Sequence, residues 1–195
     1  MSGDNVRTGE DCTVAGTATL GLRYAEDAGE TVVGDRATVR PGTVVYADVS
    51  AGDDFATGHA ALVREHSSLG DSVLVGTNAV VDGRVEIGSN VRLQTGAYLP
   101  PETTVGDNVF LGPHAVVTND AYPVREPSRL EGVTLEDDVT VGANATVLPG
   151  LTVGERSFVA AGAVVTEDIP SGTLAVGAPA THRPLPERLA GGNRP

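Results

Sequence analysis

The sequence contains one cysteine, no tryptophan, no lysine, and only 4 Tyr and 3 Phe among its 195 residues. Because Cys12 stands alone, an internal disulfide framework and a zinc site built of cysteines are both excluded. There is no apolar run long enough to span a bilayer and no basic-then-apolar leader, so we expect a cytoplasmic protein. With so few aromatics the core must be aliphatic, and the excess of valine favours strands over helices.

The charge balance is strongly acidic. Asp and Glu number 26 against 13 basic residues, all of them arginine, which gives a net charge of −13. Such a surface argues against nucleic acid or an anionic membrane as partner. The acidic residues are spread along the chain instead of forming a tail, which favours a folded domain over disorder. An acidic, lysine-free chain is typical of a protein from an extreme halophile; a GC-rich genome that writes arginine for lysine is the alternative.

A six-residue repeat runs through most of the chain. Stepping by six from Val33 to Val117 and from Leu135 to Val165 gives 21 positions, of which 19 are Val, Ile or Leu. Neither a heptad nor a 3.6-residue pattern keeps this register. A short strand plus a tight turn takes about six residues, and three such units close a triangular coil of about 18. We therefore predict an all-β fold, a parallel β-helix of about seven to eight 18-residue coils.

The three edges of this predicted prism differ in composition. The first, here called the Gly-Asp edge, repeats glycine followed by a small polar residue, as at Gly34-Asp35 and Gly52-Asp53. Glycine and aspartate suit tight turns, so we interpret this edge as structural. The second edge is also rich in small residues. The third edge has lost the turn glycines and carries these triplets instead: Tyr46-Ala47-Asp48, Arg64-Glu65-His66, Asp82-Gly83-Arg84, Pro100-Pro101-Glu102 and Thr118-Asn119-Asp120.

The third edge is therefore the predicted functional edge, because local rules fail most often at functional sites. A solvated ion-pair ladder of Arg64, Asp82 and Arg84 is the alternative interpretation. The repeat is also interrupted here, since about twelve residues are looped out within residues 119–133. A long loop on a rigid scaffold is a common place for binding, and an insertion without function is the alternative interpretation. We predict a single domain over residues 1–183 and a short C-terminal tail over 184–195.

Several motifs add a family resemblance to the repeat. They are Thr57-Gly58-His59, Val75-Gly76-Thr77-Asn78, Phe110-Leu111-Gly112-Pro113-His114, Thr118-Asn119-Asp120 with Tyr122-Pro123, and Val176-Gly177-Ala178-Pro179-Ala180. In these motifs the chain resembles the hexapeptide-repeat acyltransferases, in particular the branch that N-acetylates nucleotide-linked amino sugars. The resemblance implies a left-handed helix, a homotrimer, acetyl-CoA as donor, and a product for cell-surface glycan or glycoprotein sugar biosynthesis. It extends over roughly residues 31–181.

The resemblance also suggests which residues carry the chemistry. It places Asn119 beside the acceptor sugar, which makes this residue the first choice for orienting that sugar. The candidate bases are His66, which shares the third edge, and His114, which precedes the loop. Some relatives leave the proton to solvent. Candidate substrate-binding residues are His59, Arg64, Glu65, Asn78, Asp82, Tyr122 and Arg125.

Coenzyme A in this family lies along the prism between subunits. Small residues let its pantetheine arm approach the backbone, which suits Gly142, Ala160 and Gly162. On so acidic a chain, arginines near the C-terminus are candidates for its phosphates: Arg156, Arg183 and Arg188. We expect no metal and no resident cofactor besides acetyl-CoA as donor substrate.

Three other functions compete with amine acetylation. O-acetylation of a sugar or of a serine hydroxyl uses the same fold. A gamma-class carbonic anhydrase also has this fold but needs three zinc-binding histidines, and the spacing of His59, His66 and His114 does not match it. A scaffold without an active site is the third, and the charged third edge and the loop argue against it.

Overall fold

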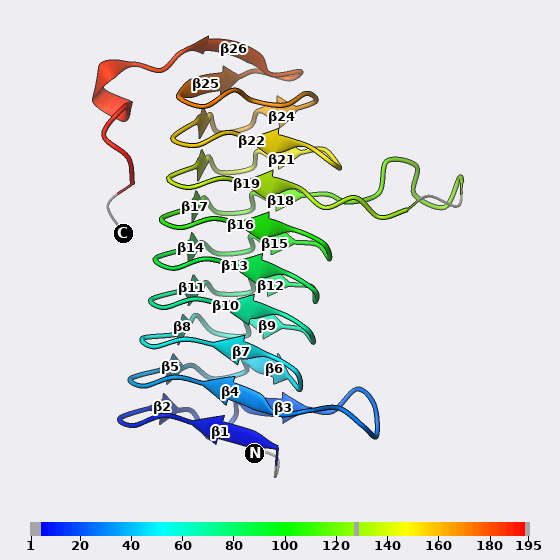
Figure 1. Cartoon of the computed structure of the whole chain (residues 1–195), viewed down its shortest axis with the longest axis vertical. Helices are drawn as coiled ribbons and strands as arrows, with labels where there is room; N and C mark the ends of the chain where they lie inside the picture. The colour runs from blue at the N-terminus through cyan, green and yellow to red at the C-terminus, as the bar shows by residue number, and fades with distance from the viewer. Residues whose placement is uncertain (1–4, 127–128, 194–195) are drawn as a thin grey trace.

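The computed structural model describes residues 5–126 and 129–193, which leaves out positions 127–128 of the predicted loop and the end of the predicted tail. The chain forms a three-sided prism whose short strands stack from the N-terminal to the C-terminal coil (Figure 1). Followed upward from the N-terminus, the coils wind with a left hand (Figure 1). The prediction of an all-β, left-handed parallel β-helix is confirmed.

Each side of the prism is one sheet, and the three are numbered here in chain order. Sheet 1 contains β1 (Val6–Thr8), β4 (Thr31–Val33), β7 (Ser50–Ala51), β10 (Ser68–Leu69), β13 (Glu86–Ile87), β16 (Thr104–Val105), β19 (Thr134–Leu135) and β22 (Thr152–Val153).

Sheet 2 contains β2 (Thr13–Val14), β5 (Thr38–Val39), β8 (Ala56–Thr57), β11 (Leu74–Val75), β14 (Arg92–Leu93), β17 (Phe110–Leu111), β20 (Thr140–Val141), β23 (Phe158–Val159), β25 (Thr173–Val176) and β26 (Thr181–Pro184). Sheet 3 contains β3 (Thr19–Leu22), β6 (Val44–Tyr46), β9 (Leu62–Val63), β12 (Val80–Val81), β15 (Tyr98–Leu99), β18 (Val116–Val117), β21 (Thr146–Val147) and β24 (Val164–Val165). The three sheets therefore provide eight full coils, as the repeat predicts.

Strand register shows where the repeat is kept and where it is broken. Val75 pairs with Leu93 and Leu93 with Leu111, each 18 residues apart, whereas Leu111 pairs with Val141 thirty residues on. The excess of twelve residues is the predicted loop, which leaves the third edge between β18 and β19 (Figure 1). A second excursion on the same edge joins β3 to β4, because Leu20 pairs with Val45 and not with a residue 18 positions away.

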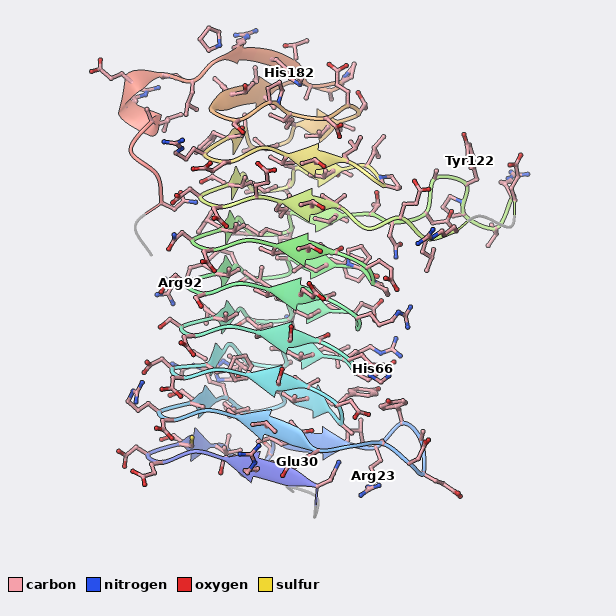
Figure 2. The ribbon with its side chains drawn as sticks, in the orientation of Figure 1. Arg23, Glu30, His66, Arg92, Tyr122 and His182 are labelled. Atoms are coloured by element: carbon pink, nitrogen blue, oxygen red, sulfur yellow. The ribbon has the colours of Figure 1, made fainter. Side chains whose placement is uncertain are left out.

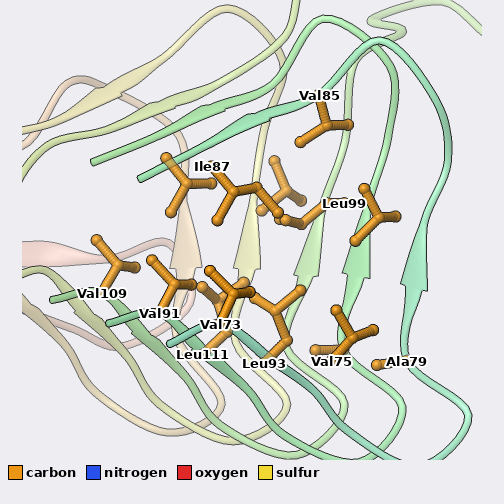
Figure 3. Packing of buried hydrophobic residues seen from close by; sticks show 14 of the residues in the cluster. Val73, Val75, Ala79, Val85, Ile87, Val91, Leu93, Leu99, Val109 and Leu111 are labelled. Atoms are coloured by element: carbon orange, nitrogen blue, oxygen red, sulfur yellow. The ribbon is translucent and has the colours of Figure 1, made fainter. Parts of the chain in front are cut away.

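The core consists of the inward side chains of the two-residue strands. Val75, Leu93 and Leu111 form one column in which every side chain is fully buried (Figure 3). Small and β-branched residues at the turns fill the corners, as Ala79, Val91 and Val109 do in the same region. One aliphatic residue per strand is thus enough to close the interior, which explains how the chain folds with so few aromatics.

The Gly-Asp edge, which joins sheet 1 to sheet 2, is held by a ladder of side-chain hydrogen bonds. Asp35 N–H donates to Asp53 Oδ1 at 2.9 Å, and Asp53 N–H donates to Asp71 Oδ1 at 2.9 Å. Asp107 Oδ1 continues the ladder by accepting from Ser89 N–H at 2.6 Å. The structural interpretation of this edge is therefore confirmed.

The C-terminal segment folds back over sheet 2. β26 pairs antiparallel with β25, and a 3₁₀ turn, η1 (Glu187–Leu189), follows it. The side-chain amide of Asn193 then donates to the carbonyl oxygens of Asn108 and Val139, at 2.9 and 3.0 Å. No helix among the described residues combines the length and the apolar character that a membrane crossing needs.

Candidate active site

The third edge, where sheet 3 turns into sheet 1, carries a network of ion pairs and hydrogen bonds. The Arg64 guanidinium binds both oxygens of Glu65, at 2.7 and 3.1 Å, and reaches Asp82 Oδ1 at 3.1 Å. The Tyr98 hydroxyl donates to Asp82 Oδ2 at 2.8 Å, and the Tyr46 ring lies under the guanidinium, 5.6 Å from its carbon. Five side chains from four successive coils therefore share one network.

The network affects the proton affinities of its members. The hydrogen bonds that Arg64 donates to Glu65 and then to Asp82 hold the pKa of its guanidinium above its usual range. Burial, followed by the hydrogen bond to Asp82, raises the pKa of Tyr98 to about 12. The guanidinium and the phenol thus both keep their protons at neutral pH. The predicted ion-pair ladder exists in part, because Arg64 pairs with Asp82 while Arg84 pairs with Glu102 at 2.7 Å.

Toward the N-terminal end of the same edge, His66 contacts the first excursion. Its Nε2 lies 2.9 Å from the Tyr24 hydroxyl, which also lies 2.7 Å from Asp48 Oδ2. The two rings meet edge to face, with centroids 5.6 Å apart. His66 projects from the third edge below the long loop that carries Tyr122 (Figure 2).

Asn119 stands at the base of the long loop. Its Nδ2 donates to the carbonyl oxygen of Pro101 at 3.0 Å, and its own carbonyl accepts from Glu131 N–H at 2.8 Å. The loop is closed at its base by these contacts, while its outer part is open to solvent: Tyr122 is 58% exposed and Arg125 is also exposed. The side-chain oxygen of Asn119 is thereby left on the opposite side of the amide from the Pro101 contact.

The third edge brings together some predicted site residues and keeps others apart. Arg64, Glu65 and Asp82 form one network, but the turn that holds His66 lies three coils from the turn that holds Asn119. At about 4.8 Å per coil, the two are separated by roughly 14 Å along the prism. In one chain, therefore, His66 and Asn119 do not act on the same reacting atom.

The second edge, where sheet 2 turns into sheet 3, holds the other predicted histidines. His59 and Asn78 lie one coil apart and are joined through the backbone, with Asn78 N–H donating to the His59 carbonyl at 3.0 Å. His114 lies on the same edge and covers Gly96, where any side chain would collide with the imidazole. These three residues do not reach the third edge within one chain.

The residues predicted to bind coenzyme A flank sheet 2. Gly142, Ala160 and Gly162 lie on the second edge, Arg156 lies on the Gly-Asp edge, and Arg183 is part of β26. Between the edges, the C-terminal segment and sheet 2 enclose a polar cavity of about 350 Å³, lined by Asp138, Thr140, Arg156, Phe158, Arg188 and Asn193, among others. No sequence pattern pointed to Asn193, or to Tyr24 on the third edge, because both belong to segments outside the repeat.

No set of three or more His, Cys, Asp and Glu side chains suited to a metal ion occurs in residues 5–126 and 129–193. His59 and His114 lie on the second edge, whereas His66 lies on the third edge.

Two stretches of the chain match models of known protein families. Residues 132–167 match the "Bacterial transferase hexapeptide (six repeats)" model, and residues 68–100 match the "Hexapeptide repeat of succinyl-transferase" model. A curated relative, the 2,3,4,5-tetrahydropyridine-2,6-dicarboxylate N-acetyltransferase of Staphylococcus aureus (strain bovine RF122 / ET3-1), is 53% identical over 57 residues. The match covers 29% of this chain and 24% of that protein, so the chain spans about a quarter of the relative's length.

Two solved structures share the fold along most of the chain. LpxA, a UDP-N-acetylglucosamine acyltransferase from Bacteroides fragilis, superposes with a TM-score of 0.76 at 14% identity, over 93% of this chain and 71% of that chain. The UDP-N-acetylglucosamine acyltransferase of Campylobacter jejuni gives a TM-score of 0.58 at 18% identity, over 90% and 73%. These identities speak for the fold alone, while the two family models confirm the predicted resemblance to the hexapeptide-repeat transferases.

Proposed function

We propose that the protein is an acetyl-CoA-dependent N-acetyltransferase that acts on the amine of a nucleotide-linked amino sugar. The observation that carries the proposal is the third edge: turn residues are replaced there by charged and polar side chains over successive coils, and the row ends at Asn119 beneath a long loop. A relative that shares 57 aligned residues is named as an N-acetyltransferase, which supports an amine acceptor. The motifs shared with the amino-sugar branch support the sugar.

The acetyl donor, acetyl-CoA, would bind against sheet 2. Its pantetheine arm would pass the small residues of the second edge, and the cavity under the C-terminal segment offers the guanidinium groups of Arg156 and Arg188 to its phosphates. Arg183 belongs to β26, which is part of sheet 2. Paired guanidinium groups are well suited to phosphate oxygens.

A homotrimer resolves a geometric difficulty in this arrangement. In a triangular prism, the third edge and sheet 2 lie on opposite sides, so donor and acceptor sites of one chain face apart (Figure 1). Contact between sheet 2 of one copy and sheet 3 of the next would bring the acceptor edge of the second copy beside the donor cavity of the first. We therefore propose a composite site in a trimer.

The outward residues of the sheets support this contact. Sheet 3 presents mainly apolar side chains and sheet 1 mainly polar ones, whereas sheet 2 presents apolar side chains together with Thr38, Arg92 and Thr140. On sheet 3 the outward residues include Val44, Leu62, Val80, Tyr98, Val116 and Val164. On sheet 2 they include Ala56, Leu74, Phe110, Phe158 and Leu174. On sheet 1 they include Ser50, Ser68, Glu86, Thr104, Thr134 and Thr152.

The reaction forms a C–N bond between the acetyl carbonyl carbon and the amine, and breaks the C–S bond of the thioester. Asn119 orients the acceptor through its side-chain oxygen. The amine proton passes to a base, for which His66 and His114 are the candidates, and then to the leaving thiolate. The oxyanion requires N–H donors near the loop base. His59, Glu65, Asn78, Asp82, Tyr122 and Arg125 are proposed to hold the sugar and nucleotide.

Acetyl-CoA is a cytoplasmic metabolite, which places the proposed enzyme in the cytoplasm. A net charge of −13 without lysine favours a halophilic source, so the assay belongs in concentrated potassium chloride. The test offers acetyl-CoA with a panel of nucleotide amino sugars and follows thiol release and product mass. A gain of one acetyl group on the amine is expected. Transfer to hydroxyl groups only would establish an O-acetyltransferase, and absence of coenzyme A binding would refute both.

A further inference from the structure

The first excursion, residues 23–30, brings a tyrosine to the third edge from outside the repeat. Leu20 pairs with Val45, 25 residues on, so this coil is seven residues longer than a regular coil of 18. The extra residues leave the prism on the same side as the long loop (Figure 1). They raise Tyr24 past the next turn, which holds Asp48, to the turn above it, which holds His66.

The contacts fix which atom donates to which. Asp48 also accepts from Gly29 N–H, at 3.0 Å through Oδ1, and the hydrogen bond from Tyr24 keeps the pKa of this carboxyl below its usual range. An ionised carboxylate only accepts hydrogen bonds, so the single Tyr24 hydroxyl proton points at Asp48 Oδ2. The phenol oxygen must then accept from His66, which requires a proton on Nε2.

The other ring nitrogen of His66 is consequently a free acceptor. Within the residues that the structure describes, no hydrogen-bond partner lies on its Nδ1, and the residue is exposed. The charged groups nearby are Asp27, Asp48 and Glu65, which act on Tyr24, together with Arg64 and Asp82 of the neighbouring network. Both arginines of this edge, Arg64 and Arg84, are already paired with carboxylates.

We propose that Tyr24 and Asp48 are positioning residues that hold His66 as its Nε2–H tautomer and present Nδ1 to the acceptor. The role in catalysis rests on the proposed acetyl transfer. When the C–N bond forms, Nδ1 takes the proton from the amine nitrogen, and the resulting imidazolium is stabilised through Tyr24 by the Asp48 carboxylate. The proton then passes to the thiolate sulfur, which restores the neutral imidazole. Asn119, three coils away, would hold a distant part of an elongated acceptor in this arrangement.

The first test reads the tautomer directly and does not need activity. ¹⁵N-labelled full-length protein at about pH 8, where imidazoles are mostly neutral, gives separate nitrogen shifts for the four histidines. Histidine substitution assigns the His66 signals. We expect the Nε2–H form in the wild type, a mixture of tautomers in Tyr24→Phe, and no change in Tyr46→Phe, which removes another hydroxyl from the same edge. An Nδ1–H wild type, or an unchanged tautomer in Tyr24→Phe, overturns the proposal.

The second test separates positioning from loop anchoring. Tyr24→Phe keeps the ring contact and is expected to lower kcat by about tenfold or more with little change in KM, within the range that general bases contribute. His66→Gln should lower kcat at least as far, and the double variant no further. Additive losses, or full kcat in Tyr24→Phe, overturn the catalytic role. A wild type that acetylates no amine refutes the proposed function instead, and the tautomer result still decides the positioning role.

Discussion

The sharpest test of the candidate site is the replacement of Asn119, because one side chain is assigned both a structural and a functional contact. Its Nδ2 donates to the Pro101 carbonyl at 3.0 Å in a half-buried position. Losing such a hydrogen bond costs about 1 kcal/mol in the free energy of unfolding, or a melting shift of about 2–4 °C at this chain length. The backbone bond from Glu131 N–H to the Asn119 carbonyl, at 2.8 Å, is retained in Asn119→Ala, so the loop base stays closed.

A functional contact would add a loss of kcat/KM that does not appear in the free energy of unfolding. If the side-chain oxygen orients the acceptor in the transition state, its removal costs a further 1.5–3 kcal/mol, or roughly ten- to hundredfold in kcat/KM. Thr118→Val is the matched control, since the Thr118 hydroxyl donates to the Val147 carbonyl at 3.0 Å one residue earlier. We expect similar melting shifts in the two variants, and a large loss of kcat/KM in Asn119→Ala alone. Equal kinetics in the two variants would refute the orienting role.

Three further predictions concern the scaffold. Asp71→Ala removes the acceptor of Asp53 N–H and should lower the free energy of urea unfolding by about 1 kcal/mol. Asp71→Asn keeps an acceptor and relieves like-charge repulsion, so its free energy of unfolding should stay within about 0.5 kcal/mol of the wild type. Equal losses in the two variants would contradict the hydrogen-bond ladder. Gly76→Ala should destabilise by about 1–3 kcal/mol in thermal unfolding, because the new Cβ would lie 2.5 Å from the Leu93 carbonyl oxygen. The pKa of Asp48 is held below its usual range by the tyrosine hydroxyl that donates to it, so its contribution to stability is complete above the ordinary pKa and is lost as pH falls through the folded value. Acid unfolding of Asp48→Asn should therefore be less steep than that of the wild type at low pH, and parallel curves would contradict this assignment.

Most of the fold follows from the period of the sequence. A six-residue register can place Val75, Leu93 and Leu111 in one buried column because identical positions stack when the strands pair in parallel. The same arithmetic identifies the third edge and the point where the long loop leaves it. Asp71 on the Gly-Asp edge is equally predictable, since glycine and aspartate at turn positions have a local cause.

The contacts that complete the candidate site were not predictable in this way. Tyr24 reaches His66 across 42 residues, and Asn193 reaches Asn108 across 85. Each lies in a segment that has left the repeat, so its path depends on tertiary contacts and not on period. The period alone groups His66 with Asn119 on one edge, and it also separates them along the prism, because their turns lie three 18-residue coils apart.

The repeat architecture also explains why the proposed site must be assembled from copies. Each coil contributes one turn to each edge, so chemistry on a single edge is spread along the prism axis at about 4.8 Å per coil and does not converge on a point. An enclosed site needs groups that approach the edge from the side. The chain provides two excursions on the third edge, and sheet 2 with its folded-back C-terminal segment faces the other way. In the proposed trimer a second copy presents its sheet 2 to this edge. The proposed acetyl transfer then depends on assembly, and the apolar outward side chains of sheets 2 and 3 that hold the copies together contribute to it.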